Sequence, residues 1–293
     1  MTEMIDYGRF AERLRRVMPR WDERDRMAPE EFARHLADTG PRWELLREFQ
    51  AEWGYEPPGG EPAWPRWSES EHRVYVRELK EKLTGEEDDH RSIRAAVAVP
   101  QALDEWWDLP FNSFTYQPRL YETNPEWPPA VYDGSQALPL DNSFIAAEED
   151  RRVCVFMAEN QYCNEWGYLA AEAVLPDPRV LVSTEDGWAV QSRSISEFFL
   201  QLAMYALPFH FGHVAEVWTV PDGLVDRVRA QLPPLGLLPW RELGAETTAY
   251  GAPDAIVFHD AGMSDYAEIV VIGRTREALE RLSHRLGVDL TAG

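Results

Sequence analysis

The sequence predicts an α+β protein, in which a mixed or antiparallel sheet is covered by helices and preceded by an N-terminal helical extension. Three observations lead to this fold class. Apolar residues recur at helical spacing near the N-terminus, whereas short runs rich in β-branched and aromatic residues begin near residue 143. Asp186-Gly187 is a strong hairpin signal. Ser194 to Leu207 is almost wholly apolar, so a helix there must be buried against the sheet.

Helical spacing defines the elements of the first part of the chain. It predicts helices from Ile5 to Met18, from Phe32 to Leu36 and from Trp43 to Trp53. The Pro- and Gly-rich segment Glu56 to Trp67 predicts a linker. Ser68 and Glu71 form a capping box for a helix that ends near Leu83. A short helix follows at about Pro100 to Trp107.

The middle of the chain predicts strands after an irregular, proline-rich stretch that ends near Leu140. The expected strands are Ser143 to Ala147, Arg152 to Met157, Tyr162 to Ala170, Arg179 to Ser183 and Trp188 to Gln191. Ala158 to Gln161 reads as a turn, because Asn160 tolerates a left-handed backbone. The second and third strands should therefore be antiparallel neighbours. The apolar helix then begins with Ser194 as its N-cap and Glu197 at the third position.

The C-terminal part predicts a strand from Val214, a helix from Leu224 to Leu232, strands at Ala255 to His259 and Ala267 to Gly273, and a closing helix from Arg274 to Leu286. These elements predict three parts. Residues 1–67 form the helical extension and linker, residues 68–210 the core, and residues 211–293 an α/β extension packed on that core.

Composition restricts the classes of partner. The chain has 293 residues with 51 Asp and Glu against 29 Lys and Arg, for a formal net charge of -22, which argues against direct binding to nucleic acid. No apolar run approaches the roughly 18 residues that span a membrane, and the N-terminus lacks the apolar stretch of a signal peptide. We therefore expect a cytoplasmic protein whose Cys154 and Cys163 are reduced, partly buried thiols.

Residues 101–150 combine about two fifths of the excess of acidic over basic residues with large aromatic side chains. This window has ten acidic residues and one basic residue, Arg119, among nine aromatic residues. Aromatic anchors among acids favour a surface that binds a basic protein, with a solvated face as the alternative. The predicted protein-binding residues are Asp104, Glu105, Trp107, Asp108, Tyr116, Glu122, Glu126, Trp127, Tyr132 and Asp133. Of the adjacent tryptophans, Trp106 is expected to face the core and Trp107 the surface.

Common catalytic signatures are missing from the sequence: there is no Gly-rich phosphate loop, dinucleotide fingerprint, nucleophile elbow or zinc-protease motif. His210, His213 and Glu216 are three residues apart and could align on a helix as metal ligands, but Gly212 argues against that helix. Glu148 and Glu149 would point to opposite faces of a strand, so their carboxyl groups could not act together as a catalytic acid and base. We expect no catalytic residue, no cofactor and no metal.

The order of several segments resembles the SUKH superfamily. They are "VPQALDEWW" (Val99 to Trp107), "RVCVFMAENQYCNEWGY" (Arg152 to Tyr168), "DPRVLV" (Asp177 to Val182), the "DGW" turn (Asp186 to Trp188) and "SISEFFLQLAMY" (Ser194 to Tyr205). This superfamily includes a yeast cell-wall synthesis regulator and many bacterial immunity proteins of polymorphic toxin systems. The resemblance covers roughly Ser92 to Phe209, and residues 1–67 have no counterpart in it. It implies a SUKH-like core with a protein-binding surface in place of an active site.

Three functional hypotheses follow. The first is a cytoplasmic immunity protein that neutralises a basic, nuclease-like toxin, because an acidic surface attracts a basic partner. The second is a regulatory or scaffold protein that binds an endogenous partner, which the helical N-terminal residues favour. The third is an undetected enzyme with a pocket among Trp106, Tyr116 and Trp127.

Overall fold

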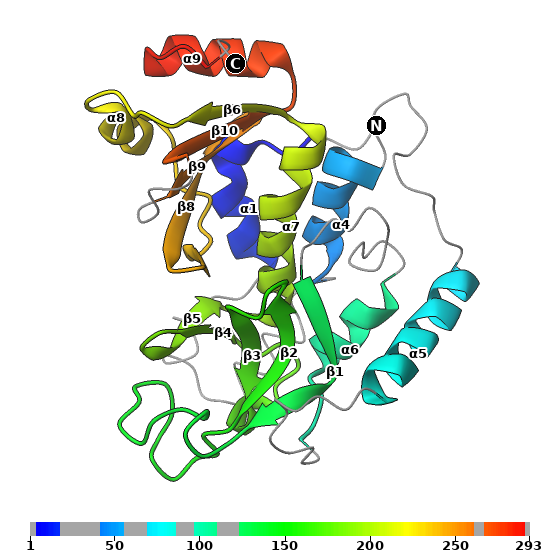
Figure 1. The fold of residues 1–293 in the computed structure, drawn as a ribbon. Helices are drawn as coiled ribbons and strands as arrows, with labels where there is room; N and C mark the ends of the chain where they lie inside the picture. Colours follow the sequence, from blue (N-terminus) through cyan, green and yellow to red (C-terminus); the bar gives the residue numbers. More distant parts are fainter. Residues whose placement is uncertain are drawn as a thin grey trace. The chain divides into compact units, whose positions relative to one another are not determined.

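The computed structural model describes residues 4–17, 42–55, 69–85, 97–109, 123–260 and 267–290 (Figure 1). These residues form an α+β protein with N-terminal helices, as the sequence predicts. They contain two five-stranded antiparallel sheets, where the sequence predicts one sheet, and seven α-helices. The chain divides into two compact units. Unit 1 comprises Met1–Pro19, Thr39–Pro65 and Phe199–Gly293, and unit 2 comprises Arg20–Asp38 and Arg66–Phe198.

Unit 2 is built on a meander in which every strand pairs with the next one along the chain, in the order β1-β2-β3-β4-β5. Its elements are α5 (Glu69–Gly85), α6 (Gln101–Asp108), β1 (Thr123–Tyr132), β2 (Val153–Glu159), β3 (Glu165–Leu169), the 3₁₀ turn Ala170–Glu172, β4 (Val180–Thr184) and β5 (Gly187–Ser192). The predicted antiparallel pairing of β2 with β3 is confirmed, with Met157 opposite Trp166. The predicted Asp186-Gly187 hairpin joins β4 to β5, and Gly187 has φ +117° there.

The two faces of this sheet have different covers. Val153 and Val155 of β2 face a cluster that includes Leu138, with Phe144 and Ile145 packed against it, so the long loop between β1 and β2 lies over this face. On the opposite face Phe156 contacts Phe198 edge-on, with ring centroids 5.5 Å apart. The hydroxyl of Tyr168, a neighbour of Phe156, donates to the carbonyl of Ala98, just before α6. Alternating side chains of β2 thus serve two cores.

Helix α7 (Ile195–Phe211) begins in unit 2 and ends in unit 1. Ser194 is its N-cap, as predicted, because the Ser194 hydroxyl accepts from the backbone N–H of Glu197 at 3.0 Å. Asp177 adds a second cap: its carboxylate accepts from the backbone N–H of Ser196 at 3.0 Å and from the Ser196 hydroxyl at 2.5 Å. The sequence segments "DP" (Asp177-Pro178) and "SISE" (Ser194 to Glu197) therefore lie together at the start of one buried helix.

Unit 1 contains the second sheet, in the strand order β6-β10-β9-β8-β7, with helices on both faces (Figure 1). Its elements are the 3₁₀ turn Tyr7–Arg9, α1 (Phe10–Val17), α4 (Glu44–Gln50), the π turn Ala51–Tyr55, β6 (His213–Val217), α8 (Leu224–Gln231), β7 (Trp240–Glu242), β8 (Ala245–Ala252), β9 (Ala255–Asp260), β10 (Ile269–Gly273) and α9 (Arg276–Leu286). Leucines of α8 and α9 pack on Val257 and Val271. Phe258 faces the other way and contacts Tyr205 of α7, with ring centroids 4.7 Å apart.

Partly buried polar contacts attach the N-terminal residues to this sheet. The Glu52 carboxylate accepts from the Tyr7 hydroxyl at 2.8 Å and from the Ile5 backbone N–H at 2.9 Å, and it pairs with Arg274. The Arg274 guanidinium lies over the Tyr7 ring, 4.7 Å from its centroid. A Cβ at Gly251 of β8 would overlap the Tyr7 carbonyl, so glycine permits this close approach.

Two predictions about the middle of the chain are wrong. Ser143 to Ala147 is not a strand, because its apolar side chains belong to the loop that covers the sheet. Residues 123–132, predicted to be irregular, form β1. The register of β1 against β2 shifts between Pro125 and Ala130, so its prolines fall at an irregularity. The predicted helix at 32–36, the linker at 56–67 and the Ser68 cap lie outside the described residues.

Candidate functional site

Among the described residues, the predicted protein-binding residues are not all exposed. Asp104 and Asp108 are exposed on α6, whereas Glu105, Trp127 and Asp133 are half-buried. Trp107, Glu126 and Tyr132 are buried, which corrects the prediction that they lie on an exposed face. Tyr116 and Glu122 lie outside the described residues.

Trp107 belongs to the core and not to the surface. It is fully buried, and Trp106 beside it is buried too, with ring centroids 5.6 Å apart. Trp107 also meets Trp127 of β1 edge-on, with centroids 5.6 Å apart. The buried His72 of α5 donates through Nε2 to the Trp107 carbonyl at 3.0 Å, and burial lowers the pKa of His72. Trp107 therefore joins α5, α6 and β1 inside unit 2, which a surface anchor does not do.

Lys80 of α5 is held over these aromatic rings. Its ammonium lies 3.7 Å from the Trp127 centroid and 5.4 Å from the Trp107 centroid, and 3.3 Å from an Asp104 carboxylate oxygen. Such a cation–π arrangement is stabilising when the ammonium is partly desolvated. Three of the predicted residues thus come together, but they bind a side chain of the same chain.

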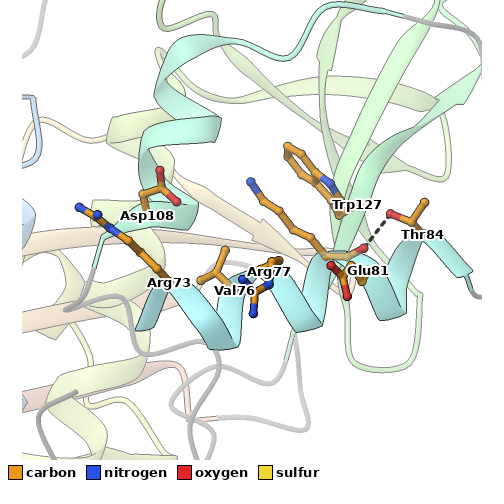
Figure 2. Close-up of a pocket in the computed structure, with 8 residues that line it drawn as sticks. Arg73, Val76, Arg77, Glu81, Thr84, Asp108 and Trp127 are labelled. Atoms are coloured by element: carbon orange, nitrogen blue, oxygen red, sulfur yellow. Dashed lines mark hydrogen bonds between the residues drawn. The ribbon is translucent and has the colours of Figure 1, made fainter. Parts of the chain in front are cut away.

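An open pocket of about 470 Å³ lies beside Lys80. Figure 2 shows Trp127 and Asp108 over the same side of α5. The pocket is lined by Arg73, Val76, Arg77, Lys80, Glu81, Thr84, Asp108 and Trp127. Its size suits a small ligand, but its lining mixes cationic and anionic groups and specifies no ligand charge. The enzyme hypothesis placed a pocket at Trp106, Tyr116 and Trp127; of the two tryptophans, which the structure describes, Trp127 lines this pocket and Trp106 does not.

Acidic residues of the window lie on both sides of the first sheet. Asp104 and Asp108 belong to α6, on the Tyr168 side. The loop 133–150 lies over the opposite face and carries exposed Asp141, Glu148 and Glu149. Leu140, in the same loop, is 69% exposed. The loop is fixed at Phe144, whose carbonyl accepts from Arg179 at 2.7 Å. The loop is therefore packed against the sheet at Phe144, and it exposes carboxylates and one large apolar side chain, that of Leu140, to solvent.

The loop between β2 and β3, called here the Tyr162 loop (Asn160–Asn164), has a defined conformation. The Glu159 carboxylate accepts from the backbone N–H of Gln161 at 2.8 Å and of Cys163 at 3.3 Å. The Tyr162 backbone N–H donates to the Glu159 carbonyl at 2.9 Å. Tyr162 has φ +61°, in the left-handed region, and the residue is 54% exposed. The sequence predicts the turn at Ala158 to Gln161 and the next strand from Tyr162, whereas Ala158 and Glu159 belong to β2 and Tyr162 is an exposed loop residue.

The other candidate chemistry is not assembled. His210 is in the last turn of α7 and His213 and Glu216 are in β6, so the three do not share a helical face. Within the described ranges no group of three or more His, Cys, Asp or Glu side chains is arranged to hold a metal ion. Cys154 is buried, which raises the pKa of its thiol to about 12, whereas Cys163 is exposed, and both thiols are free. A protonated, buried thiol is a poor nucleophile.

Comparison of the chain with protein-family models, with curated proteins and with solved structures finds no match. None of the helices in the described part of the chain has the length and hydropathy that crossing a membrane requires.

Proposed function

We propose that this chain is a non-catalytic, cytoplasmic protein-binding protein of the SUKH type that neutralises a basic, nuclease-like toxin domain. The observation that carries the proposal is the exposure of carboxylates on the loop 133–150. A surface of this charge accelerates encounter with a basic partner, and a large exposed apolar side chain adds contact area that is buried on binding. A regulatory protein that binds an endogenous basic partner would use the same surface, and the partner's identity separates the two.

Two features of unit 2 favour the loop 133–150, and not α6, as the binding surface. The loop carries exposed Leu140 next to exposed Asp141, whereas the aromatic residues of α6 are buried. Asp104 of α6 is also paired with Lys80, which reduces its attraction for a partner. We therefore assign the binding of the basic partner to the loop.

The test compares two charge-matched triple variants. The first is Asp141→Asn/Glu148→Gln/Glu149→Gln in the loop, and the second is Asp104→Asn/Glu105→Gln/Asp108→Asn in α6. The partner is a toxin domain encoded beside this chain's gene, and surface plasmon resonance gives the rates at two salt concentrations. The loop variant should associate about tenfold more slowly at low salt, with a flatter salt dependence, while the α6 variant changes less.

Leu140→Ser should speed dissociation with little change in the association rate, because the side chain contributes only after contact. The proposal fails if the loop variant associates like the unchanged protein at both salt concentrations, or if the toxin domain does not bind.

A further inference from the structure

We propose that the open pocket on α5 is a binding site for a free α-amino acid with an apolar side chain. Arg77 receives the carboxylate of this ligand and Glu81 receives its ammonium group, while Val76 and Trp127 contact its side chain. The site does not include the loop 133–150, so the inference goes beyond the proposed function and can fail without it.

The first argument is the construction of the pocket. Three elements of unit 2 border its volume of about 470 Å³: α5, the end of α6 at Asp108, and β1 at Trp127 (Figure 2). Small-molecule sites in proteins commonly measure about 300–1,000 Å³. The pocket therefore has the size of a small-molecule site that is shared by packed elements.

The second argument is that the lining carries both signs of charge and leaves some of its charged groups unpaired. Lys80 is already held, by the Asp104 carboxylate and over the Trp127 ring. By contrast, Arg77, Glu81 and Asp108 form no hydrogen bond or ion pair within the described part of the chain. Such a lining favours neither a net anion nor a net cation. It matches a ligand that itself carries both charges, as a zwitterion does.

The third argument is the spacing of Arg77 and Glu81. They are four residues apart on α5, so their side chains leave one face of the helix with their Cβ atoms about 6 Å apart. An α-amino acid carries its carboxylate and its ammonium on one carbon atom, and it needs a cation and an anion that are neighbours. The planar guanidinium of Arg77 can donate two parallel hydrogen bonds to a carboxylate, and the Glu81 carboxylate accepts from an ammonium.

The fourth argument is the apolar part of the lining. Val76 is buried and Trp127 is half-buried. The Trp127 ring is fixed between the Lys80 ammonium and the Trp107 ring, so it is in place before a ligand binds. An apolar ligand side chain removes water from these groups, which favours leucine over glycine.

Titration calorimetry on the full chain tests the proposal with L-leucine as the probe. Arg77→Gln and Glu81→Gln each remove one charge from an exposed position of α5, and glutamine has a high helix propensity, so the fold is retained. Each should weaken L-leucine binding about tenfold, because a hydrogen bond between charged groups is lost. Lys82→Gln and Glu78→Gln are the matched controls. They remove the same charges from exposed positions of α5 outside the pocket and should bind like the unchanged protein.

Two derivatives of leucine separate a free amino acid from the end of a peptide. L-Leucinamide keeps the ammonium but lacks the carboxylate, as an N-terminal residue does. N-Acetyl-L-leucine keeps the carboxylate but lacks the ammonium, as a C-terminal residue does. Both should bind about tenfold more weakly than L-leucine, and glycine should also bind more weakly because it has no side chain.

Three outcomes would overturn the inference. They are no binding of L-leucine, binding of either derivative as tight as that of L-leucine, and a loss of affinity in the two controls equal to that in Arg77→Gln and Glu81→Gln. The proposed function stands in each case, because its test measures a toxin domain on the loop 133–150.

Discussion

Glu197 is a fully buried carboxyl group in the first turn of α7. Its carboxylate accepts from Arg193 at 2.8 Å, but burial outweighs this ion pair, and the nearby Asp177 charge adds to its effect. Together they raise the pKa of Glu197 from 4.5 to about 7. The folded state therefore binds a proton that the unfolded state releases between these two pH values.

This shift predicts a pH-dependent free energy of unfolding. Because the folded pKa is raised, the stabilisation is fully present below pH 4.5 and is lost as pH rises through about 7. The loss is on the order of 3 kcal/mol. In Glu197→Gln this part of the pH dependence should be absent, which urea unfolding between pH 5 and 8 will measure. Glu148→Gln, an exposed carboxyl in the loop 133–150, should keep the slope of the unchanged protein. An equally steep profile in Glu197→Gln would contradict the assignment.

At the scale of single residues, the sequence does not predict whether an aromatic side chain is buried, because burial depends on how the elements pack together. The exposed acids of α6 could be predicted, because ionised groups are rarely buried without a partner. Trp106 and Trp107 could not be told apart in this way, since α6 packs between a sheet and α5 and buries both rings. The exposure of Tyr162 could not be predicted, because it depends on the hydrogen bonds of Glu159 that hold the loop in its conformation. The polar residues of the loop do not by themselves specify that conformation.

At the scale of elements, the sequence predicts strands well where alternation and a turn coincide. β2, β3, β4 and β5 were found because their apolar residues are bounded by turn residues. β1 contains Pro125, Pro128 and Pro129, which interrupt the strand pattern, and β8 is rich in small and Thr residues. Both strands pair with a well-patterned strand that follows them along the chain, β1 with β2 and β8 with β9, so pairing stabilises them where local propensity does not predict them.

Helix α5 contacts the rest of unit 2 through few buried side chains. Of residues 71–85, only His72 and Val76 are buried, so the Lys80 contact with Trp127 carries a large share of the attachment. Lys80→Met keeps the aliphatic chain but removes the charge, and should reduce the protection of α5 amides by about 1 kcal/mol in hydrogen exchange. Lys82→Met, on the exposed part of the same helix, is the control. Equal protection in both variants would show that packing alone holds α5.

At the scale of the whole molecule, residues from both ends of the chain form unit 1. The sequence predicts helices near residues 5–18 and 43–53 but gives no information on which sheet they cover. The grouping arises from contacts such as Glu52 with Arg274, which are more than 200 residues apart. Pairings of this separation depend on three-dimensional packing, which periodicity in one segment does not encode.

Gly251 provides a test of this grouping. Gly251→Ala places a methyl group against the Tyr7 carbonyl and 2.8 Å from Leu235, so the N-terminal turn must move away from β8. Overpacking of this kind should cost about 2 kcal/mol or more, and amide protection should fall in β8 and β9 together with residues 7–17. Gly85→Ala is the matched control, because a Cβ there meets nothing within 4 Å and α5 is helical at that point. If Gly251→Ala lowers protection in β8 but leaves residues 7–17 unchanged, the N-terminal residues are not part of the same cooperative unit.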